Sequence, residues 1–492
     1  MRESAGAGAG GPAGAGAGGL AGAGARGPAQ AGARGPARAG ARGSRLITAG
    51  RVLLGDGDAL DDAAVLVEHG RIAWVGPATE AGRLAYGETD SFPGGCLVPG
   101  LIDAHVHLCF RYGADLTAPA EDAAAVAATV ALHCGRLLKA GVTSVRDLGS
   151  AGRAVQQARD AIARGELDGP RIRCSGRPVT AAGGHLSSFG LAASGEAGLA
   201  AAVAAVARDG ADIVKIVATG GAGTPGTPLG RAQFTTGELR AAVRAAAGLG
   251  LAVAAHAHGT EGIARAVAAG VHTVEHCSWI DLAGGIGSPD PAVLAEMRRR
   301  RQIGVIAGPL PPALAGQLAS GVPALAAPAP AGPSSGSPAA PPSASPDGPS
   351  SVSPDGPSSV SLATADPAGR TRAIWRNARV SREHGVAQAL GTDAMFGQFD
   401  DDHDLAWRAQ GLVEQAGWPA AHVLEALWRG GAAALGSPGL LGAIAPGAHA
   451  DLVVLGGDPG ADIRALHDVR AVYRAGLRCL EPAVKPSKLV GY

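Results

Sequence analysis

The sequence is poor in aromatic residues, at 3% Phe, Trp and Tyr, and it has no excess of either charge. A core with so few rings must consist mainly of Ala, Val, Leu and Ile, which suits helices packed closely on a sheet. Lys plus Arg equal Asp plus Glu at 42 each, so the sequence offers no basic face for nucleic acid or an anionic membrane. We therefore expect a small-molecule substrate and no nucleic-acid or membrane partner.

Cysteines and long apolar runs are also scarce. The six cysteines are scattered and form no CxxC pair, which argues against a disulfide framework and a structural zinc ribbon. We interpret them as small core residues in a reducing compartment. No apolar run reaches the roughly 18 residues that cross a bilayer, and the N-terminus has no apolar segment of the signal-peptide type. A soluble, cytoplasmic protein is expected.

Two regions have a low-complexity composition. Residues 1–44 are almost wholly Ala, Gly, Pro and Arg, with the repeats ARGPAQAG and ARGPARAG. Residues 311–369 are rich in Pro, Ala and Ser and contain SPDGPSSV twice in tandem. Neither stretch can bury enough side chain to offset the entropy of ordering it. We predict a disordered leader and a disordered insertion in a surface loop.

Both ends of the remaining chain have a β-like pattern. RLITAGRVLLG and AAVLVEHGRIAWVG near the start, and HADLVVLGGDP and VRAVYRAGLRCL near the end, are rich in Val, Ile and Leu and are separated by Gly and Asp turn signals. These runs predict a small β-sandwich domain formed by residues 45–97 together with residues 440–481.

The middle of the chain, residues 98–439, alternates short apolar segments with Ala-rich amphipathic ones. Alternation of this kind is typical of parallel β–α–β units in an α/β fold. Eight segments qualify as strands, the number that closes a (β/α)8 TIM barrel. They are GLIDAHVHL, GVTSVRDLG, PRIRCSG, ADIVKIVATGG, LAVAAHAHG, HTVEHCSWI, IGVIAGPL and ALGTDA.

Polar residues stand at the carboxyl ends of these predicted strands, on the face where barrel enzymes place their active sites. His105 and His107 are two positions apart on one strand and so point the same way, as a shared metal ion requires. The others are Asp147, Lys215, His256, His276 and Asp393. Asp147 is equally compatible with a hydrogen-bonding role in its loop. No GxSxG motif is present, which disfavours a serine hydrolase.

PGLIDAHVHL, VKIVATGG, AAHAHG, TVEHCSWID and GTDA, in this order, resemble motifs of the amidohydrolase superfamily. The resemblance is to the branch that holds imidazolonepropionase-like proteins and Xaa-Pro dipeptidase or zinc carboxypeptidase relatives, and it covers about residues 45–481, interrupted by the insertion. It implies a hydrolase of carbon–nitrogen bonds. By analogy with these relatives a homo-oligomer is also expected.

The resemblance implies a site for two divalent metal ions, with zinc the natural first choice for a His-rich site. His105, His107 and Asp393 fall where the family has ligands of one ion, and His256 and His276 where it has ligands of the other. Lys215 falls where this branch has a carboxylated lysine that bridges both ions. A carbamate is an anionic oxygen donor, whereas an ammonium group has no lone pair.

The resemblance also implies a mechanism in which Asp393 is the catalytic base for a metal-activated bridging water. His185 and His258 fall at positions that in the peptidase-like relatives meet the substrate's carbonyl or carboxylate. Dipeptides or N-acyl amino acids are therefore the expected substrates.

Two alternatives stay open at this stage. An imidazolonepropionase-like cyclic amide hydrolase or deaminase would use a single metal without a bridging lysine, so Lys215 speaks against it. A non-enzymatic barrel scaffold that presents the Pro-rich insertion as a polyproline ligand would require vestigial metal residues. None of those residues is missing.

Overall fold

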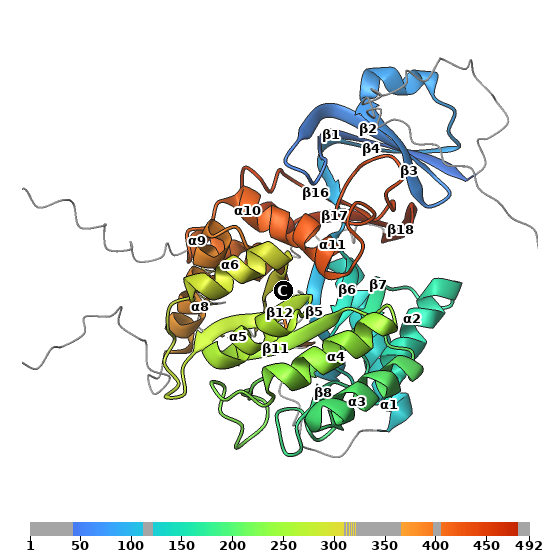
Figure 1. Cartoon of the computed structure of the whole chain (residues 1–492). Helices are drawn as coiled ribbons and strands as arrows, with labels where there is room; N and C mark the ends of the chain where they lie inside the picture. The colour runs from blue at the N-terminus through green and yellow to red at the C-terminus, as the bar shows by residue number, and fades with distance from the viewer. Residues whose placement is uncertain are drawn as a thin grey trace, which may run out of the picture.

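The computed structural model describes residues 43–111, 122–308, 366–396 and 405–480, with residues 311, 314, 316, 318 and 320. Figure 1 shows the first and last strands together at one end of the molecule and the strand–helix units of the middle of the chain at the other. The long strand β5 lies in the second part and follows β4 of the first part after a single residue.

The terminal part is one seven-stranded sheet. In spatial order its strands are β18 (Leu477–Leu480), β17 (Val469–Arg474), β16 (Leu452–Leu455), β4 (Glu88–Pro99), β1 (Ser44–Leu53), β2 (Ala59–Glu68) and β3 (Arg71–Pro77). Antiparallel pairing of β16 with β4 joins the two ends of the chain, for example Val453 opposite Val98. Strands from both ends therefore lie in one sheet, while its arrangement as a two-layer sandwich stays a prediction.

The middle of the chain forms two parallel sheets, and all eight segments predicted as strands are strands. One sheet has the order β15 (Ala394–Phe396), β5 (Leu101–Arg111), β6 (Val142–Asp147) and β7 (Arg171–Cys174). The other has the order β14 (Ala387–Leu390), β13 (Ile303–Ile306), β12 (Thr273–Ile280), β11 (Val253–Gly259), β10 (Val214–Val217), β8 (Val179–Thr180) and β9 (Leu191–Ala192). This is an α/β fold, and closure of the two sheets into a barrel stays a prediction.

Helices follow most of these parallel strands. They are α1 (Ala123–Lys139), α2 (Ala154–Arg164), α3 (Gly195–Arg208), α4 (Thr236–Gly248), α5 (Thr260–Ala269), α6 (Pro291–Arg300), α8 (Pro367–Glu383), α9 (Leu405–Glu414), α10 (Ala420–Glu425) and α11 (Gly431–Ala434). The chain also has two short 3-10 helices, η1 (Ala78–Arg83) and η3 (Ile463–His467), and a π-helical segment, η2 (Ala426–Gly430). Local sequence sets their ends, as where Thr235 and Glu238 form a reciprocal capping box at the start of α4.

The core is aliphatic, as the composition predicted. Strand β10, with the sequence VKIV, is buried at every position, as expected of a parallel strand covered on both faces. Against it pack Ala and Val side chains of α3, α4 and α5. Four of the six cysteines are buried, whereas Cys277 and Cys479 are partly exposed, so the interpretation as core residues holds for those four only.

Most of the two low-complexity regions lies outside the described residues. Their predicted boundaries differ slightly from the observed elements, because Ser44 already begins β1 and the insertion's last residues form the first turn of α8. The Asp366 side chain accepts a hydrogen bond from the Gly369 backbone, and Pro367 follows it as the first helical residue. These are start signals of a helix. None of the helices that the structure describes combines the length and apolar character needed to cross a bilayer.

Candidate metal centre

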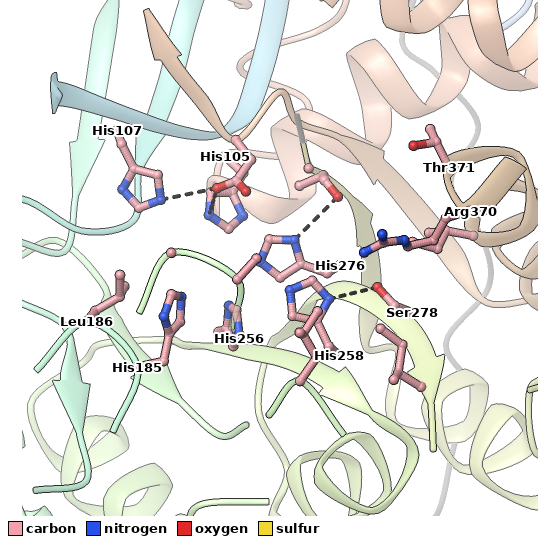
Figure 2. A pocket seen from close by; sticks show the side chains of 18 of the residues that line it. His105, His107, His185, Leu186, His256, His258, His276, Ser278, Arg370 and Thr371 are labelled. Carbon is pink, nitrogen blue, oxygen red and sulfur yellow. Dashed lines mark hydrogen bonds and ion pairs between the residues drawn. The ribbon is translucent and has the colours of Figure 1, made fainter. Parts of the chain in front are cut away.

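Most of the polar residues noted in the sequence line one cavity of about 290 Å³ at the carboxyl ends of the parallel strands, whereas Asp147 is not part of its wall. Figure 2 shows its histidine rings turned toward one another. The predicted ligands and substrate contacts all line it, namely His105, His107, His185, Lys215, His256, His258, His276 and Asp393. The fold thus brings together residues of the four strands β5, β10, β11 and β12 and of the loops that follow β8 and β14.

His105, His107 and Asp393 meet at one point of the cavity. The Asp393 Oδ1 atom lies 3.3 Å from His105 Nε2 and 3.2 Å from His107 Nε2. Asp393 follows β14 in a left-handed backbone conformation, with φ of 55°, and its backbone N–H donates to the His105 carbonyl at 2.7 Å. A methyl group added at Gly391 would lie 2.6 Å from His105 Cβ, so the glycine of the GTDA motif permits this close approach.

Four histidines each have one ring nitrogen beside an oxygen acceptor. His107 Nδ1 lies 2.8 Å from the Gly149 carbonyl, and His256 Nε2 lies 3.0 Å from the Gly220 carbonyl. His276 Nδ1 faces the Ala307 carbonyl, and His105 Nδ1 lies 2.9 Å from the Glu275 carboxylate. Since these oxygens only accept, that ring nitrogen carries the proton, and in a neutral ring the other nitrogen keeps a lone pair suited to a metal ion. Burial opposes protonation of His107, but a hydrogen bond to Asp393 raises the pKa of this ring.

Burial keeps most of these imidazoles neutral. It lowers the pKa of His105 and of His258 to about 4 and that of His185 to about 3. Burial, with the neighbouring histidines, also holds the pKa of His256 and of His276 well below the ordinary value. A neutral imidazole is the form that binds metal.

Lys215 lies fully inside the site. Its Nζ atom is 3.3 Å from His105 Nε2, and its side chain is 1% exposed. Burial lowers the pKa of Lys215 to about 8, although Glu275 and Asp393 act in the opposite direction. A buried amine with a lowered pKa has an appreciable neutral fraction, which is the form that reacts as a nucleophile.

The histidines of β11 and β12 form a second group. Donor atoms of His256, His258 and His276 lie within 4.8 Å of one another, as do those of His105, His276 and Asp393. His258 also stacks on His276, with ring centroids 4.3 Å apart. The geometry therefore groups His258 with the expected ligands, although the resemblance implies that it contacts the substrate. His276 belongs to both groups.

His185 lies in the loop between β8 and β9, and its ring centroid is 4.9 Å from that of His256. A methyl group added at Gly221 would lie 2.3 Å from His185 Nε2, so the VATGG glycines permit close packing at the site. Asp147 accepts hydrogen bonds from the backbone N–H groups of Leu108 and Gly149. These bonds give it the structural loop role that the sequence left open.

A buried ion pair beneath the site was missed in the sequence. Arg146 and Glu275 are both fully buried, and Arg146 Nη2 lies 2.8 Å from Glu275 Oε1, while the other Glu275 oxygen holds His105 Nδ1. Burial opposes ionisation of Glu275, but Arg146 and His105 lower its pKa to about 2. Arg146 lies in the segment GVTSVRDLG and Glu275 in TVEHCSWID. A charged residue within an apolar strand is the sequence feature that could have indicated this buried ion pair.

We expect Glu275→Gln to destabilise the protein by about 3 kcal/mol, because it leaves the buried Arg146 without a counter-charge. Metal affinity should also fall roughly tenfold or more, since Glu275 orients His105. Thermal unfolding and metal titration measure the two effects. The greater stability of the wild type is present above the ordinary pKa of a glutamate, and it is lost as the pH falls toward 2.

The exposed Glu166, paired with Arg164, supplies a control, because Glu166→Gln should change neither quantity. Equal stability and metal affinity of Glu275→Gln and the wild type would contradict the orienting role.

Comparison with known proteins identifies the class of domain. The model of the Amidohydrolase family matches residues 96–298. An ochratoxinase from Aspergillus niger is 29% identical over 267 residues, which cover 48% of this chain and 55% of that protein. The chain thus spans about half the length of this curated relative. An imidazolonepropionase from Shewanella loihica is 48% identical over 54 residues, 11% of this chain and 13% of that protein.

Among solved structures, a Xaa-Pro dipeptidase with methionine bound in its active site has a TM-score of 0.66 and 25% identity. The match covers 88% of this chain and 99% of that chain. Residues 96–298 therefore match a domain of the Amidohydrolase family. These findings confirm the resemblance drawn from the motifs and agree with the predicted class of hydrolases acting on carbon–nitrogen bonds.

Proposed function

We propose that the protein is a metal-dependent amidohydrolase that cleaves amide or peptide bonds of small substrates such as dipeptides or N-acyl amino acids. One observation carries this proposal. Four histidines each have one ring nitrogen beside an oxygen acceptor, and all four line a cavity that also holds Asp393 and Lys215. This is how proteins orient imidazoles toward metal ions.

The donor set fits two divalent ions, for which we propose zinc. His105, His107 and Asp393 would hold one ion, and His256 and His276 the other. Lys215, once carboxylated on Nζ, would bridge them. The position of Nζ, 3.3 Å from His105 Nε2, supports this role, since a protonated amine there would repel a metal ion.

Bound ions would lower the pKa of a water molecule and polarise the scissile carbonyl. Asp393 takes the proton of the attacking water and delivers it to the leaving nitrogen. Burial opposes ionisation of Asp393, but His105 and a hydrogen bond from His107 hold its pKa below the usual range. The residue therefore starts the reaction as a carboxylate.

The cavity wall suits a small substrate with an apolar part. Phe110, Phe189 and Leu229 line it beside the histidines, and we propose that His185 and His258 contact the substrate's carbonyl or carboxylate. The Ser278 hydroxyl, 2.9 Å from His258 Nδ1, supports an oriented role for that ring.

We also propose that the two parallel sheets belong to one (β/α)8 barrel. Two backbone hydrogen bonds support this: Asp212, just before β10, donates to Cys174 of β7 at 2.8 Å, and Asp393, just after β14, donates to His105 of β5 at 2.7 Å. The division into a barrel and a terminal domain, the cytoplasmic location and a homo-oligomeric state are further parts of this proposal.

The proposal is tested by assaying a panel of dipeptides and N-acyl amino acids before and after removal of metal with a chelator. We expect hydrolysis that disappears on chelation and returns on addition of zinc with bicarbonate. Hydrolysis that withstands complete metal removal would contradict the proposal. Turnover of cyclic amides alone would favour the imidazolonepropionase-like alternative.

A further inference from the structure

The cavity has a cationic end on helix α8. Arg370 lines the cavity from the first turns of this helix, and Figure 2 shows its guanidinium group directed toward His276 and His258. No ion pair joins it to any acidic side chain of the described residues. Within the part of the chain that the structure describes, this cation therefore faces the cavity with its donors available for a ligand.

The other cations of the cavity wall are already engaged. Arg408 donates to the backbone carbonyls of Gly308 and Thr392, and Lys215 lies against His105. Among the described residues of the wall, Asp393 is the only acid, and it faces His105 and His107. Within the described wall the charge of Arg370 is thus uncompensated, which favours an anionic group of the substrate at this end.

The opposite end is aromatic. The rings of Phe110 and Phe189 lie 5.0 Å apart, and that of Phe110 lies 6.3 Å from the His107 ring. In Figure 2, His107 and His185 lie on the far side of the histidine cluster from Arg370. The candidate metal centre therefore lies between the two phenylalanine rings and Arg370, whose helix also brings Trp375 to the cavity wall.

Resting on the proposed function, we propose that Arg370 binds the substrate's free carboxylate and thereby orients the substrate. A planar guanidinium group can hold a carboxylate through two parallel hydrogen bonds. His258 and His185 suit a single polar contact better, because each has one ring nitrogen already beside a hydroxyl, of Ser278 and Thr224 respectively. The apolar acyl part then lies toward Phe110 and Phe189, and the scissile amide lies over the centre.

The test compares Arg370→Met with Arg372→Met in the full, metal-loaded chain. Arg372 is on the same helix, lies 3.8 Å from Asp366 and is absent from the described cavity wall, so its variant is the matched control. The two substrates are N-acetyl-L-phenylalanine and its carboxamide, which differ in the carboxylate charge. Acetate release gives kcat and KM for each.

We expect the wild type and Arg372→Met to prefer the acid over the amide at least about tenfold in kcat/KM, as for a charge-assisted hydrogen bond. Arg370→Met should lose this preference through a higher KM for the acid, with the amide unaffected. An Arg370→Met variant that keeps the wild-type preference would overturn the assignment.

Binding of 3-phenylpropanoate, measured by calorimetry, separates this inference from the proposed function. If neither substrate is hydrolysed, the proposed function fails for this substrate pair. In that case Arg370→Met should still bind 3-phenylpropanoate about tenfold more weakly than the wild type and Arg372→Met, which would support a carboxylate site. Equal binding by the wild type and both variants overturns it.

Discussion

Asp393→Asn is expected to lower kcat about a thousandfold, within the range that a general base contributes. The amide cannot take a proton from water, and it is a poorer metal ligand than a carboxylate. KM should change little, because the substrate contacts that we propose lie on other residues. Steady-state kinetics together with metal content measures both roles of the residue.

Asp281 offers a matched control at the same edge of the sheets. Its carboxylate accepts a hydrogen bond from the Gly285 backbone at 2.8 Å, which an asparagine side chain can also accept. Asp281→Asn should therefore keep wild-type kinetics. A wild-type kcat in Asp393→Asn would rule out its role as the base.

Lys215→Ala is expected to lower the activity about a thousandfold or more, which corresponds to a loss of about 4 kcal/mol of transition-state stabilisation. The variant loses the bridging carbamate, so its metal content should also fall. Addition of acetate or propionate should restore part of the activity, because a small carboxylate can occupy the space of the missing carbamate. Kinetics with and without these acids, beside elemental analysis, tests the prediction.

Lys215→Arg serves as the companion variant, since it keeps a positive charge that cannot be carboxylated. We expect it to be inactive and not rescued by carboxylates. Thermal unfolding should show both variants folded, which separates loss of the ligand from loss of the fold. Full activity in either variant would exclude a carbamate at this position.

The sequence predicts the parallel strands well because their buried runs are short and continuous. Val214–Val217 is an example, where every residue is buried although Lys215 interrupts the apolar pattern. Polar residues at the ends of such runs must meet, since parallel strands point their carboxyl ends to the same edge. This is why His105 and Asp393, far apart in the chain, could be placed together.

Contacts that depend on the third dimension could not be predicted in the same way. The pairing of Arg146 with Glu275 joins β6 and β12, which belong to different sheets, and no local sequence pattern predicts it. Arg370 belongs to a segment that the composition assigned to no site, directly after the Pro-rich insertion. Its direction toward the histidines emerges only from the packing of α8 over the cavity.

The grouping of the histidines also needed the structure. On β11, His256 and His258 are two positions apart, as are His105 and His107 on β5. Alternation alone therefore gives both pairs the same direction. Only the family resemblance separated His256, as a ligand, from His258, as a substrate contact. In the structure His258 lies both with His256 and His276 and beside Ser278.

The central claim is tested most directly by counting metal ions per chain, by elemental analysis of protein purified in the presence of bicarbonate. The account predicts two ions per wild-type chain, as in two-metal hydrolases, and fewer in Lys215→Ala. One ion per wild-type chain would favour the cyclic amide hydrolase or deaminase. Absence of bound metal after purification with zinc and bicarbonate would contradict the account.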